Sequence, residues 1–310
     1  MDALIQSLVQ ANFAPERIVP QASMAQYTTL RIGGPAEVLV SINAADEIAV
    51  ALRAAKQVDA PVTIIGNGSN LLVRDGGIPG LVLRISGGMN AIRREGDGLI
   101  AQAGASLAAV AAFARDEGLS GMAELGGIPG TVGGGVLMNA GAYGAELSQV
   151  VTQVEGVSLA DGRRVAFPAD RLDFSYRHSA LMDAGVVITQ AALALAPGDP
   201  KAIRARMEEC AKARREKQPL NLPSAGSTFK RPEGYFAAKL IDDCGLRGLT
   251  VGGAQVSEKH AGFLVNLGGA TAHDMLELMR QVEQRVFEQT GVQLEPEVRI
   301  LGVDEADGRK

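Results

Sequence analysis

The sequence predicts an α+β fold in which a larger N-terminal part precedes a smaller C-terminal domain. A strand–helix–strand pattern covers residues 35–65, and apolar strands continue to about residue 195. After Pro197–Pro200 the composition changes to a strongly charged helical segment. We therefore expect two α+β units, residues 1–198 and 199–310, the first divided near residue 80 into segments 1–80 and 81–198.

The N-terminal elements follow from periodicity. Asp2–Asn12 is helical, Pro35–Ser41 reads as a strand, and Ala44–Val58 places its apolar residues on one helix face. Pro61–Ile65 then forms a second strand. The loop Gly66–Asn70 comes directly after that strand, which is where open α/β folds place their ligand loops.

The remaining elements are bounded by local signals. Ser106 is a helix N-cap, and the Asp161-Gly162 pair indicates a β-hairpin. We expect strands at Leu81–Ile85, Gly98–Ala103, Val150–Leu159, Arg163–Phe167 and Val186–Leu195, helices at Leu107–Glu117, Lys201–Lys217, Tyr235–Asp243 and Ala272–Thr290, short strands near Val251 and Phe263, and a last strand at Val292–Leu301.

The composition is that of a soluble globular protein, with 46% hydrophobic and 21% charged residues in a chain of 310. A net charge of −5 and the absence of tryptophan argue against nucleic-acid binding. Two cysteines suit a reducing compartment, and the three histidines lack the spacing of metal ligands, so we expect no metal. The N-terminus lacks the basic region of a secretory signal, and no apolar run would span a membrane. We expect a cytoplasmic protein.

The stretch Gly126–Gly144 is the strongest functional signal. Eight of its nineteen residues are glycine and none is charged. Successive free backbone N–H groups bind anions such as a pyrophosphate, and glycine lets the backbone approach a ligand closely. The stretch therefore predicts a nucleotide loop, although a connector packed between strands is the alternative. Gly66–Asn70 resembles a second anion loop or an ordinary turn, and neither segment fits a P-loop or a Rossmann fingerprint.

Three further positions are candidate catalytic groups. Arg177 follows an aromatic residue and is suited to a carboxylate or phosphate, or is a surface arginine. Ser227 follows a glycine that would expose its hydroxyl, so catalysis and a turn or cap role both stay open. On the predicted last strand, period two would place Glu295, Glu297 and Arg299 on one face, either solvated or functional.

Six motifs occur in an order that resembles one enzyme family, the UDP-N-acetylenolpyruvoylglucosamine reductases, or UDP-N-acetylmuramate dehydrogenases, flavoenzymes of bacterial peptidoglycan precursor synthesis. The resemblance extends from about Tyr27 to Gly302. Its motifs are Gly66–Val73, Gly127–Gly133, Asn139–Gly144, Ser175–Ser179, Gly226–Lys230 and Leu294–Arg299.

The resemblance implies an FAD-binding unit of the vanillyl-alcohol-oxidase/p-cresol-methylhydroxylase type, in two parts, followed by a C-terminal α+β substrate domain. It implies FAD as cofactor, NADPH as reducing co-substrate, and a UDP-linked amino sugar carrying an enolpyruvyl ether as substrate. Hydride from reduced FAD and a proton from a serine would give UDP-N-acetylmuramate. We expect a monomer that binds neither nucleic acid nor membrane.

The resemblance also assigns residues by motif. Arg177, Ser227 and Glu297 match the catalytic residues, with Ser227 the proton donor. The substrate-binding positions are Tyr143, Lys217 and Lys230. The FAD-binding positions are Gly66, Asn67, Gly68, Ser69, Asn70, Gly127, Gly130, Thr131, Gly133, Gly134, Asn139, Gly141 and Ala142.

The chain departs from the family pattern at two places. Arg231 stands where some members have asparagine, and the segment after Gly144 lacks an inserted tyrosine loop, so the chain resembles a shorter subgroup. Two other functions are weighed against a reductase. One is an oxidase of the same fold, whose reduced flavin would react rapidly with oxygen, and the other is a nucleotide-binding module without catalysis.

Overall fold

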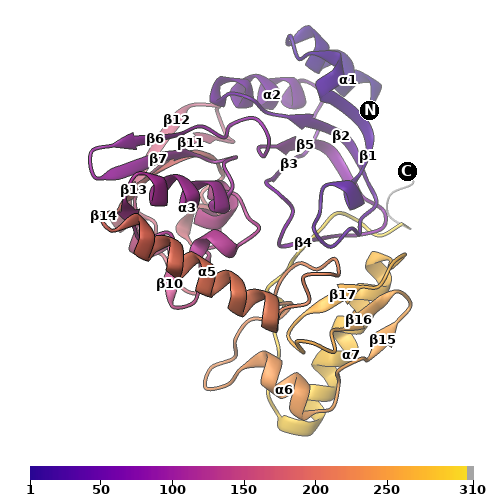
Figure 1. The fold of residues 1–310 in the computed structure, drawn as a ribbon. Coiled ribbons are helices and arrows are strands. Elements are labelled where there is room, and N and C mark those ends of the chain that lie inside the picture. The colour runs from indigo at the N-terminus through magenta and orange to yellow at the C-terminus, as the bar shows by residue number, and fades with distance from the viewer. Residues whose placement is uncertain (306–310) are drawn as a thin grey trace. The chain divides into compact units, whose positions relative to one another are not determined.

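The computed structural model describes residues 1–305, which form two compact units (Figure 1). Unit 1 consists of residues 1–20, 38–67 and 80–214, and unit 2 of residues 21–37, 68–79 and 215–305. Three of the five boundaries between the units fall inside strands β1, β2 and β5, one falls between Asn67 and Gly68, and one falls inside helix α5. The divisions expected near residues 80 and 198 stay a prediction.

The first sheet has the strand order β1-β2-β5-β3. Strand β3 pairs in parallel with β5, so β5 lies between the two strands of the predicted strand–helix–strand unit. Helix α2 makes that crossover and packs against α1. The elements are α1 (Asp2–Gln10), β1 (Ile18–Ser23), β2 (Pro35–Ser41), α2 (Ala45–Gln57), β3 (Val62–Ile65) and β5 (Ile78–Arg84).

The second sheet is antiparallel, has the order β12-β11-β13-β7-β6, and lies in unit 1. The predicted hairpin at Asp161-Gly162 is confirmed, since Gly162 has φ +72° and Asp161 Oδ1 accepts from Arg163 N at 3.1 Å. The strands are β6 (Ile92–Glu95), β7 (Gly98–Gln102), β11 (Val151–Ser158), β12 (Arg164–Pro168) and β13 (Val186–Ala194).

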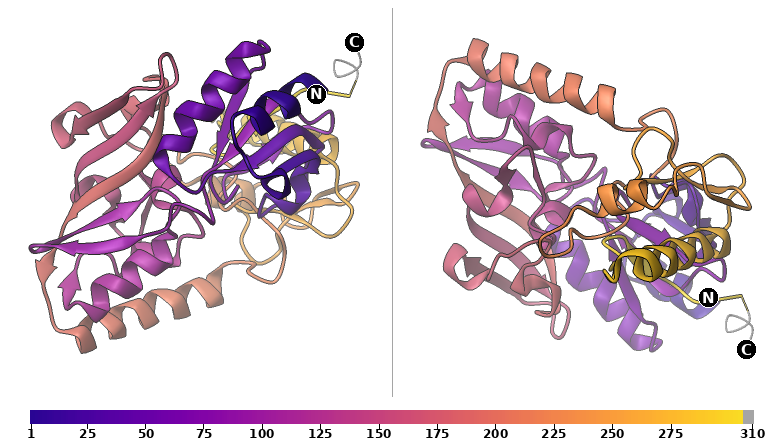
Figure 2. Two further views of the ribbon diagram at one scale, coloured as in Figure 1. Left: turned by 90° about the horizontal axis from the view of Figure 1, so that it is seen from above. Right: turned by 90° about the horizontal axis from the view of Figure 1, so that it is seen from below.

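Helices cover this sheet and close the core of unit 1. Helix α4 packs on β7 and β13, and Figures 1 and 2 both show α3 beside the same sheet. Ser106 caps α3 as predicted, because its hydroxyl accepts from Ala109 N at 3.1 Å. The other elements of unit 1 are α3 (Leu107–Asp116), α4 (Val132–Leu137), α5 (Pro200–Lys217, its last turn in unit 2) and the short pairs β8 (Leu119–Ser120) with β14 (Ala196–Pro197) and β9 (Gly141–Ala142) with β10 (Ala145–Glu146).

Unit 2 has its own core, in which α7 packs against α6 and against a three-stranded sheet of order β15-β16-β17. Figure 2 shows α6 and α7 side by side. A parallel pair joins β4 to β18, and Asp75 accepts from the first two N–H groups of α7 at 2.8 and 2.9 Å. The elements are β4 (Leu71–Val73), α6 (Ala237–Asp243), β15 (Thr250–Val251), β16 (Ala254–Val256), β17 (Leu264–Asn266), α7 (Ala272–Thr290) and β18 (Arg299–Leu301).

The predicted last strand, Val292–Leu301, is wrong over most of its length. Only Arg299–Leu301 forms a strand, and the segment before it makes one isolated bridge, between Pro296 and Phe229. Proline lacks the N–H that a continuous ladder requires. The buried residues of the segment, Leu294 and Val298, lie four apart, which period two allows, so a shared face for Glu295, Glu297 and Arg299 stays a prediction.

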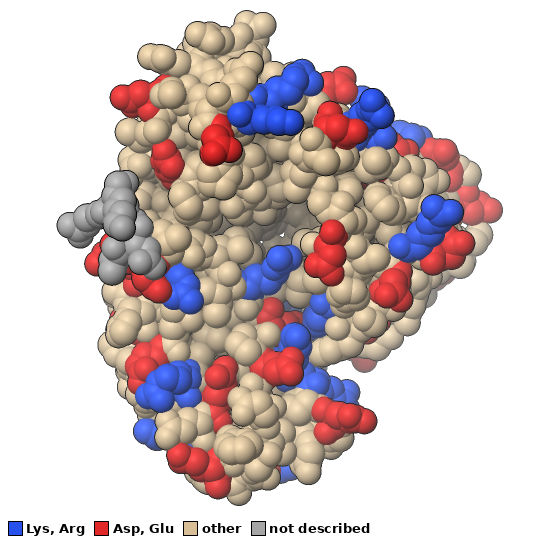
Figure 3. Space-filling model, turned by 180° about the vertical axis from the view of Figure 1, so that it is seen from behind, with Lys and Arg blue, Asp and Glu red and all other residues tan. Residues whose placement is uncertain are grey.

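Surface charge gives no extended basic region on the face shown in Figure 3, where acidic and basic side chains are interspersed. In the part of the chain that the structure describes, no helix combines the length and apolarity of a membrane span. Within the same residues, no three His, Cys, Asp or Glu side chains gather in a way that would hold a metal ion.

Candidate functional site

The two glycine segments meet within unit 1. Asn67 Nδ2 donates to the Pro129 carbonyl at 3.3 Å, and a Cβ at Gly66 would lie 2.7 Å from Thr131 Oγ1. That separation is shorter than real Cβ contacts allow, so the backbone of residue 66 approaches residue 131 only because it is glycine. Thr131 is in turn the N-cap of α4, because its Oγ1 accepts from Gly134 N at 3.3 Å.

Part of the glycine stretch serves packing. It was expected as a loop, but residues 132–137 form α4, and the N–H of Gly133 donates to Ala103 O at 2.9 Å. A Cβ at Gly133 would lie 3.0 Å from the Ala103 Cβ, and one at Gly135 would lie 2.9 Å from Leu147. These two glycines let α4 sit close to its neighbours, as the connector alternative proposed. Gly134 is exposed, and a Cβ there would meet only Thr131 Oγ1 at 3.6 Å.

The first glycine loop keeps its amides available. Among the described residues, the backbone N–H groups of Gly68, Ser69 and Asn70 have no acceptor. Gly68 has φ +62°, and a Cβ there would lie 2.1 Å from the Tyr27 carbonyl oxygen. This is the conformation and close approach that only glycine permits, and consecutive free amides are suited to an anion.

Arg177 lies in a tight turn that side chains fasten to the glycine stretch. Ser175 and His178 exchange backbone hydrogen bonds of 3.2 Å across the turn. The Asn139 amide donates to Ser175 O at 3.1 Å, and Ser179 Oγ donates to the Leu137 carbonyl at 2.8 Å. The predicted catalytic arginine and the predicted cofactor segment are therefore neighbours in unit 1.

Several residues of this region have unusual backbone conformations, among them Asn139 with φ +42°. Arg177 has φ +55° and Tyr143 has φ +52°, in the left-handed region that residues other than glycine rarely adopt. The Arg177 guanidinium lies over the Tyr176 ring, 4.9 Å from its centroid. Strained residues of this kind cluster at functional sites because the surrounding contacts must hold them there.

Asn139 has a structural role that its motif did not indicate. Its side chain is buried, its Oδ1 accepts from Ser148 N at 2.9 Å, and its Nδ2 donates to Glu146 Oε2 at 3.0 Å as well as to Ser175. All its polar atoms are thus used inside unit 1. The cofactor contact assigned to Asn139 stays a prediction and would fall to its carbonyl, because its N–H donates to Val136 O at 3.2 Å.

Arg214, near the end of α5, is a candidate that sequence reasoning missed. A Cβ at Gly127 would lie 3.4 Å from its Nη1, and its Nε is buried with no hydrogen-bond partner among the described residues. Burial lowers the pKa of the guanidinium, and the phenol of Tyr143 is close enough to act on it electrostatically. A half-buried cation that none of the described carboxylates neutralises favours an anionic ligand. No sequence signal separates Arg214 from its neighbour Arg215.

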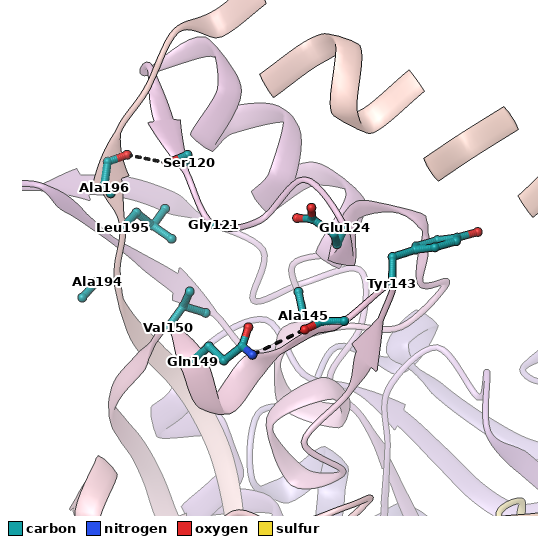
Figure 4. A pocket seen from close by; sticks show the side chains of 11 residues that line it. Ser120, Gly121, Glu124, Tyr143, Ala145, Gln149, Val150, Ala194, Leu195 and Ala196 are labelled. Carbon is teal, nitrogen blue, oxygen red and sulfur yellow. Dashed lines mark hydrogen bonds between the residues drawn. The ribbon is translucent and has the colours of Figure 1, made fainter. Parts of the chain in front are cut away.

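Burial raises the pKa of Tyr143, and the Arg214 charge partly offsets this effect. Tyr143 also lines a surface pocket of about 550 Å³ between the Ser120–Glu124 and Ala194–Ala196 segments, shown in Figure 4. The acid in this pocket, Glu124, is paired with Arg206 at 2.7 Å. Of the predicted site residues only Tyr143 lines the pocket, and its lining contains no Lys or Arg that would bind a phosphate, so we do not place the cofactor there.

The predicted catalytic residues of unit 2 come together through the main chain. Lys230 N donates to Glu295 O at 2.8 Å, and Glu297 N donates to Thr228 O at 2.7 Å. Ser227 and Glu297 are therefore held in adjacent segments whose register is fixed by backbone bonds. Asn70 Nδ2 donates to the Glu297 carbonyl at 3.1 Å, which ties the first glycine loop to this pair of segments within unit 2.

The side chains around Ser227 are solvent-accessible. Ser227 is exposed, it follows Gly226 at φ +80°, and its hydroxyl has no partner among the residues described. Lys230 Nζ lies 3.2 Å from Glu295 Oε2, and Lys217 is exposed at the end of α5. Arg231 stacks on Phe236, with 4.0 Å from its Cζ to the ring centroid.

Comparisons with known proteins match the N-terminal and C-terminal parts of the chain to two different domains. Residues 218–301 match the family described as UDP-N-acetylenolpyruvoylglucosamine reductase, C-terminal domain, and residues 36–167 match an FAD binding domain. The predicted α+β fold with an FAD-binding part and a C-terminal domain is confirmed.

Similarity extends over nearly the full length of individual relatives. The chain is 47% identical to the UDP-N-acetylenolpyruvoylglucosamine reductase of Pediococcus pentosaceus, over 96% of this chain and 98% of that protein. It is 50% identical to the reductase of Agathobacter rectalis, over 90% and 92%. The crystal structure of UDP-N-acetylenolpyruvylglucosamine reductase (MurB) from Thermus caldophilus superposes with a TM-score of 0.78 at 38% identity, over 92% of this chain and 98% of that one.

Proposed function

Because the chain belongs to the family of UDP-N-acetylenolpyruvoylglucosamine reductases and is an FAD-dependent oxidoreductase, we propose that it reduces the enolpyruvyl group of UDP-N-acetylenolpyruvoylglucosamine with NADPH. The product is UDP-N-acetylmuramate. The observation that carries the assignment of residues is the backbone pairing of the Ser227 segment with the Glu297 segment, which supports a shared role for these two side chains.

The residues present fit FAD. Gly66 and Gly68 let the first glycine loop pack closely against Thr131 and Tyr27, which fixes the backbone that would face the ligand. The N–H groups of Gly68, Ser69 and Asn70 are suited to hold a diphosphate oxygen, as a concave run of amides does elsewhere. When bound, FAD supplies hydride chemistry, taking a hydride from NADPH and delivering it to the alkene.

Ser227 supplies the proton. Hydride addition at C3 of the enolpyruvyl group leaves an electron pair at C2, delocalised into the carboxylate. The Ser227 O–H bond breaks, its proton forms the new C–H bond at C2, and solvent returns a proton to the serine oxygen. An alcohol is a weak acid, but the carbanionic centre is strongly basic, so the transfer is feasible once the hydroxyl is positioned.

Arg177 stabilises the charge that develops on the carboxylate. A guanidinium binds both carboxylate oxygens through parallel N–H donors, and its attraction grows as negative charge accumulates. Glu297 works beside the same anion, so its side chain acts within a hydrogen-bonded network.

The remaining cations are suited to the anionic parts of the substrate. Arg214, Lys217 and Lys230 offer positive charge, and Tyr143 offers a phenolic donor close to Arg214. Lys230 is shared with Glu295 in the structure, so its contribution to a diphosphate is the smallest of the three. No observation gives Arg231 a comparable role, since its guanidinium stacks on Phe236.

Separate measurement of the two half-reactions tests the proposal. The holoenzyme is first reduced anaerobically by NADPH and then mixed with the enolpyruvyl nucleotide or with oxygen, and flavin absorbance is followed. We expect fast reoxidation by the nucleotide and slow reoxidation by oxygen. Fast reaction with oxygen alone would identify an oxidase, and protein that gains no flavin on reconstitution would indicate a binding module.

A further inference from the structure

A turn formed by residues 257–264 of unit 2 lies directly against the Ser227 segment. Gly262 O accepts from Thr228 N at 2.9 Å, and Thr228 Oγ1 accepts from Leu264 N at 3.1 Å. The peptide group that joins Ser227 to Thr228 is thus fixed from one side by this turn. On the other side, Thr228 O accepts from Glu297 N at 2.7 Å.

His260 closes the turn from within. Its Nδ1 accepts from Gly262 N at 3.2 Å, and its carbonyl accepts from Phe263 N at 2.9 Å. The imidazole meets the Phe263 ring edge-on, with centroids 4.9 Å apart. A Cβ at Gly262 would lie 3.0 Å from Ala238 Cβ and 3.1 Å from His260 Cε1, so residue 262 is tightly packed between the two.

The hydrogen bond defines the state of the ring. Nδ1 accepts a hydrogen bond from an N–H only when it carries no hydrogen itself, so the imidazole is neutral with its hydrogen on Nε2. Burial, the largest influence, lowers the pKa of His260, which agrees with a neutral ring. A protonated ring would lose the acceptor and release the Gly262 amide.

We propose that His260 is a positioning residue for the proton donor: its Nδ1 holds Gly262, and Gly262 O holds the Ser227–Thr228 peptide in the orientation that the proton transfer requires. The proposal rests on the proposed function of Ser227 and extends it to a residue that does not touch the substrate. The chain of bonds runs from His260 through Gly262 to Thr228, and from Thr228 to Glu297.

Two variants of His260 distinguish the contribution of the Nδ1 acceptor from that of the ring. His260→Asn keeps an acceptor on the same carbon as Nδ1 and removes the ring, whereas His260→Phe keeps a ring against Phe263 and removes the acceptor. His273→Asn, at an exposed position of α7, is the matched control. We expect reoxidation of the reduced holoenzyme by the enolpyruvyl nucleotide to fall about tenfold in His260→Phe and less than threefold in His260→Asn, the change expected for one lost hydrogen bond.

Two further measurements accompany the reoxidation rate. Flavin reduction by NADPH should be the same in all three variants and in the wild type. Amide hydrogen exchange of the segment 226–230 should be faster in His260→Phe than in His260→Asn. Equal reoxidation rates in the two variants, or a slower rate in His260→Asn, would overturn the proposal. A wild-type enzyme that NADPH reduces but the enolpyruvyl nucleotide does not reoxidise would refute the proposed function instead.

Discussion

The two units hold their proposed catalytic residues in different ways. In unit 1, Arg177 sits in a strained turn that is tied down by the side chains of Asn139 and Ser179. In unit 2, Ser227 and Glu297 belong to segments that are paired through backbone groups. Hydrogen bonds between backbone groups stay in place when a side chain is replaced. A hydrogen bond made by a side chain is lost when that residue is replaced.

This difference determines what a substitution measures. A change of the Ser227 side chain removes a hydroxyl and leaves its surroundings in place, so its effect reports chemistry. A change in unit 1 also alters stability, because the anchors of the turn are buried. The predictions below therefore separate rate effects in unit 2 from combined effects in unit 1.

The largest effect is expected for Ser227→Ala. Loss of a positioned proton donor should slow reoxidation of the flavin by the enolpyruvyl nucleotide by about 10²- to 10⁴-fold. Reduction by NADPH and the melting temperature should stay at wild-type values, because the hydroxyl has no partner among the residues described. Ser224→Ala, three residues earlier, is the control. Equal slowing of both half-reactions would exclude Ser227 as the donor.

Arg177→Gly should give the second largest effect and separates function from strain. Glycine adopts φ +55° without steric cost, which offsets the loss of the guanidinium contact with Tyr176, so the free energy of unfolding should change by less than about 1 kcal/mol. Reoxidation by the nucleotide should fall by about 10²-fold, because the guanidinium is lost. Arg177→Lys should also be impaired, since lysine lacks the planar fork. Near-normal turnover in either variant would refute carboxylate binding by Arg177.

Asn139→Ala tests the side-chain anchor of unit 1. The substitution leaves the Ser148 N–H and the Ser175 carbonyl without the partner they have now, at a cost of about 1–3 kcal/mol in the free energy of unfolding. Denaturant unfolding of the apoprotein measures this loss, with the exposed Asn90→Ala as control. Turnover should fall as well, because the Arg177 turn loses a tether. A stable variant with full activity would show that Ser179 and the backbone contacts hold the turn without Asn139.

Two adjacent glycines of α4 distinguish packing from ligand contact. Gly133→Ala would press against Ala103 and should destabilise the apoprotein by about 1–3 kcal/mol. Gly134→Ala has room and should stabilise it by about 0.5–1 kcal/mol, as alanine does in a helix. If Gly134 contacts FAD as the motif implies, its variant should nevertheless bind FAD several-fold more weakly by fluorescence titration. Unchanged affinity would assign Gly134 to the helix alone.

Much of the fold could be predicted from local patterns. The caps and turns depend on neighbouring residues, so Ser106 and the Asp161-Gly162 hairpin were predicted correctly. The strand expected at Val292–Leu301 was wrong because Pro296 breaks the ladder and the segment follows Thr228 through isolated bonds. The membership of residues 21–37 and 68–79 in unit 2 depends on distant bonds, such as Asp75 with α7, that no local pattern encodes.

The residues of the candidate site also fall into two groups, those that local sequence patterns predict and those that they do not. Motifs identified Arg177, Ser227 and the glycine loops, since a motif keeps the residues that chemistry requires. They did not reveal Arg214 or His260, whose roles depend on burial and on which atoms they face. Motifs also placed Asn139 at the cofactor, while the structure shows its side chain binding the protein itself.

The smallest effect is expected on stability, from the loss of one of two ion pairs, one in each unit. In unit 1, Arg17 donates to Glu47 from Nη1 at 2.8 Å, and this hydrogen bond, the largest influence, holds the pKa of Glu47 below its ordinary value of 4.5. In unit 2, Lys230 and Glu295 are both largely exposed. Glu47→Gln should lower the free energy of unfolding at pH 7 by up to about 1 kcal/mol, whereas Glu295→Gln should change it by less than about 0.5 kcal/mol.

The pH dependence of the free energy of unfolding tests whether loss of the Arg17–Glu47 ion pair causes the lower stability of Glu47→Gln. A carboxyl whose pKa is lowered on folding binds its proton more weakly in the folded protein, so its contribution is complete above pH 4.5. As the pH falls through the lowered pKa, the contribution disappears, and the curves of wild type and Glu47→Gln should converge. Urea unfolding of the apoprotein between about pH 3 and 7 measures this. A difference that stays constant across that range would mean that the Glu47→Gln substitution perturbs packing and that the charge of Glu47 is not the cause.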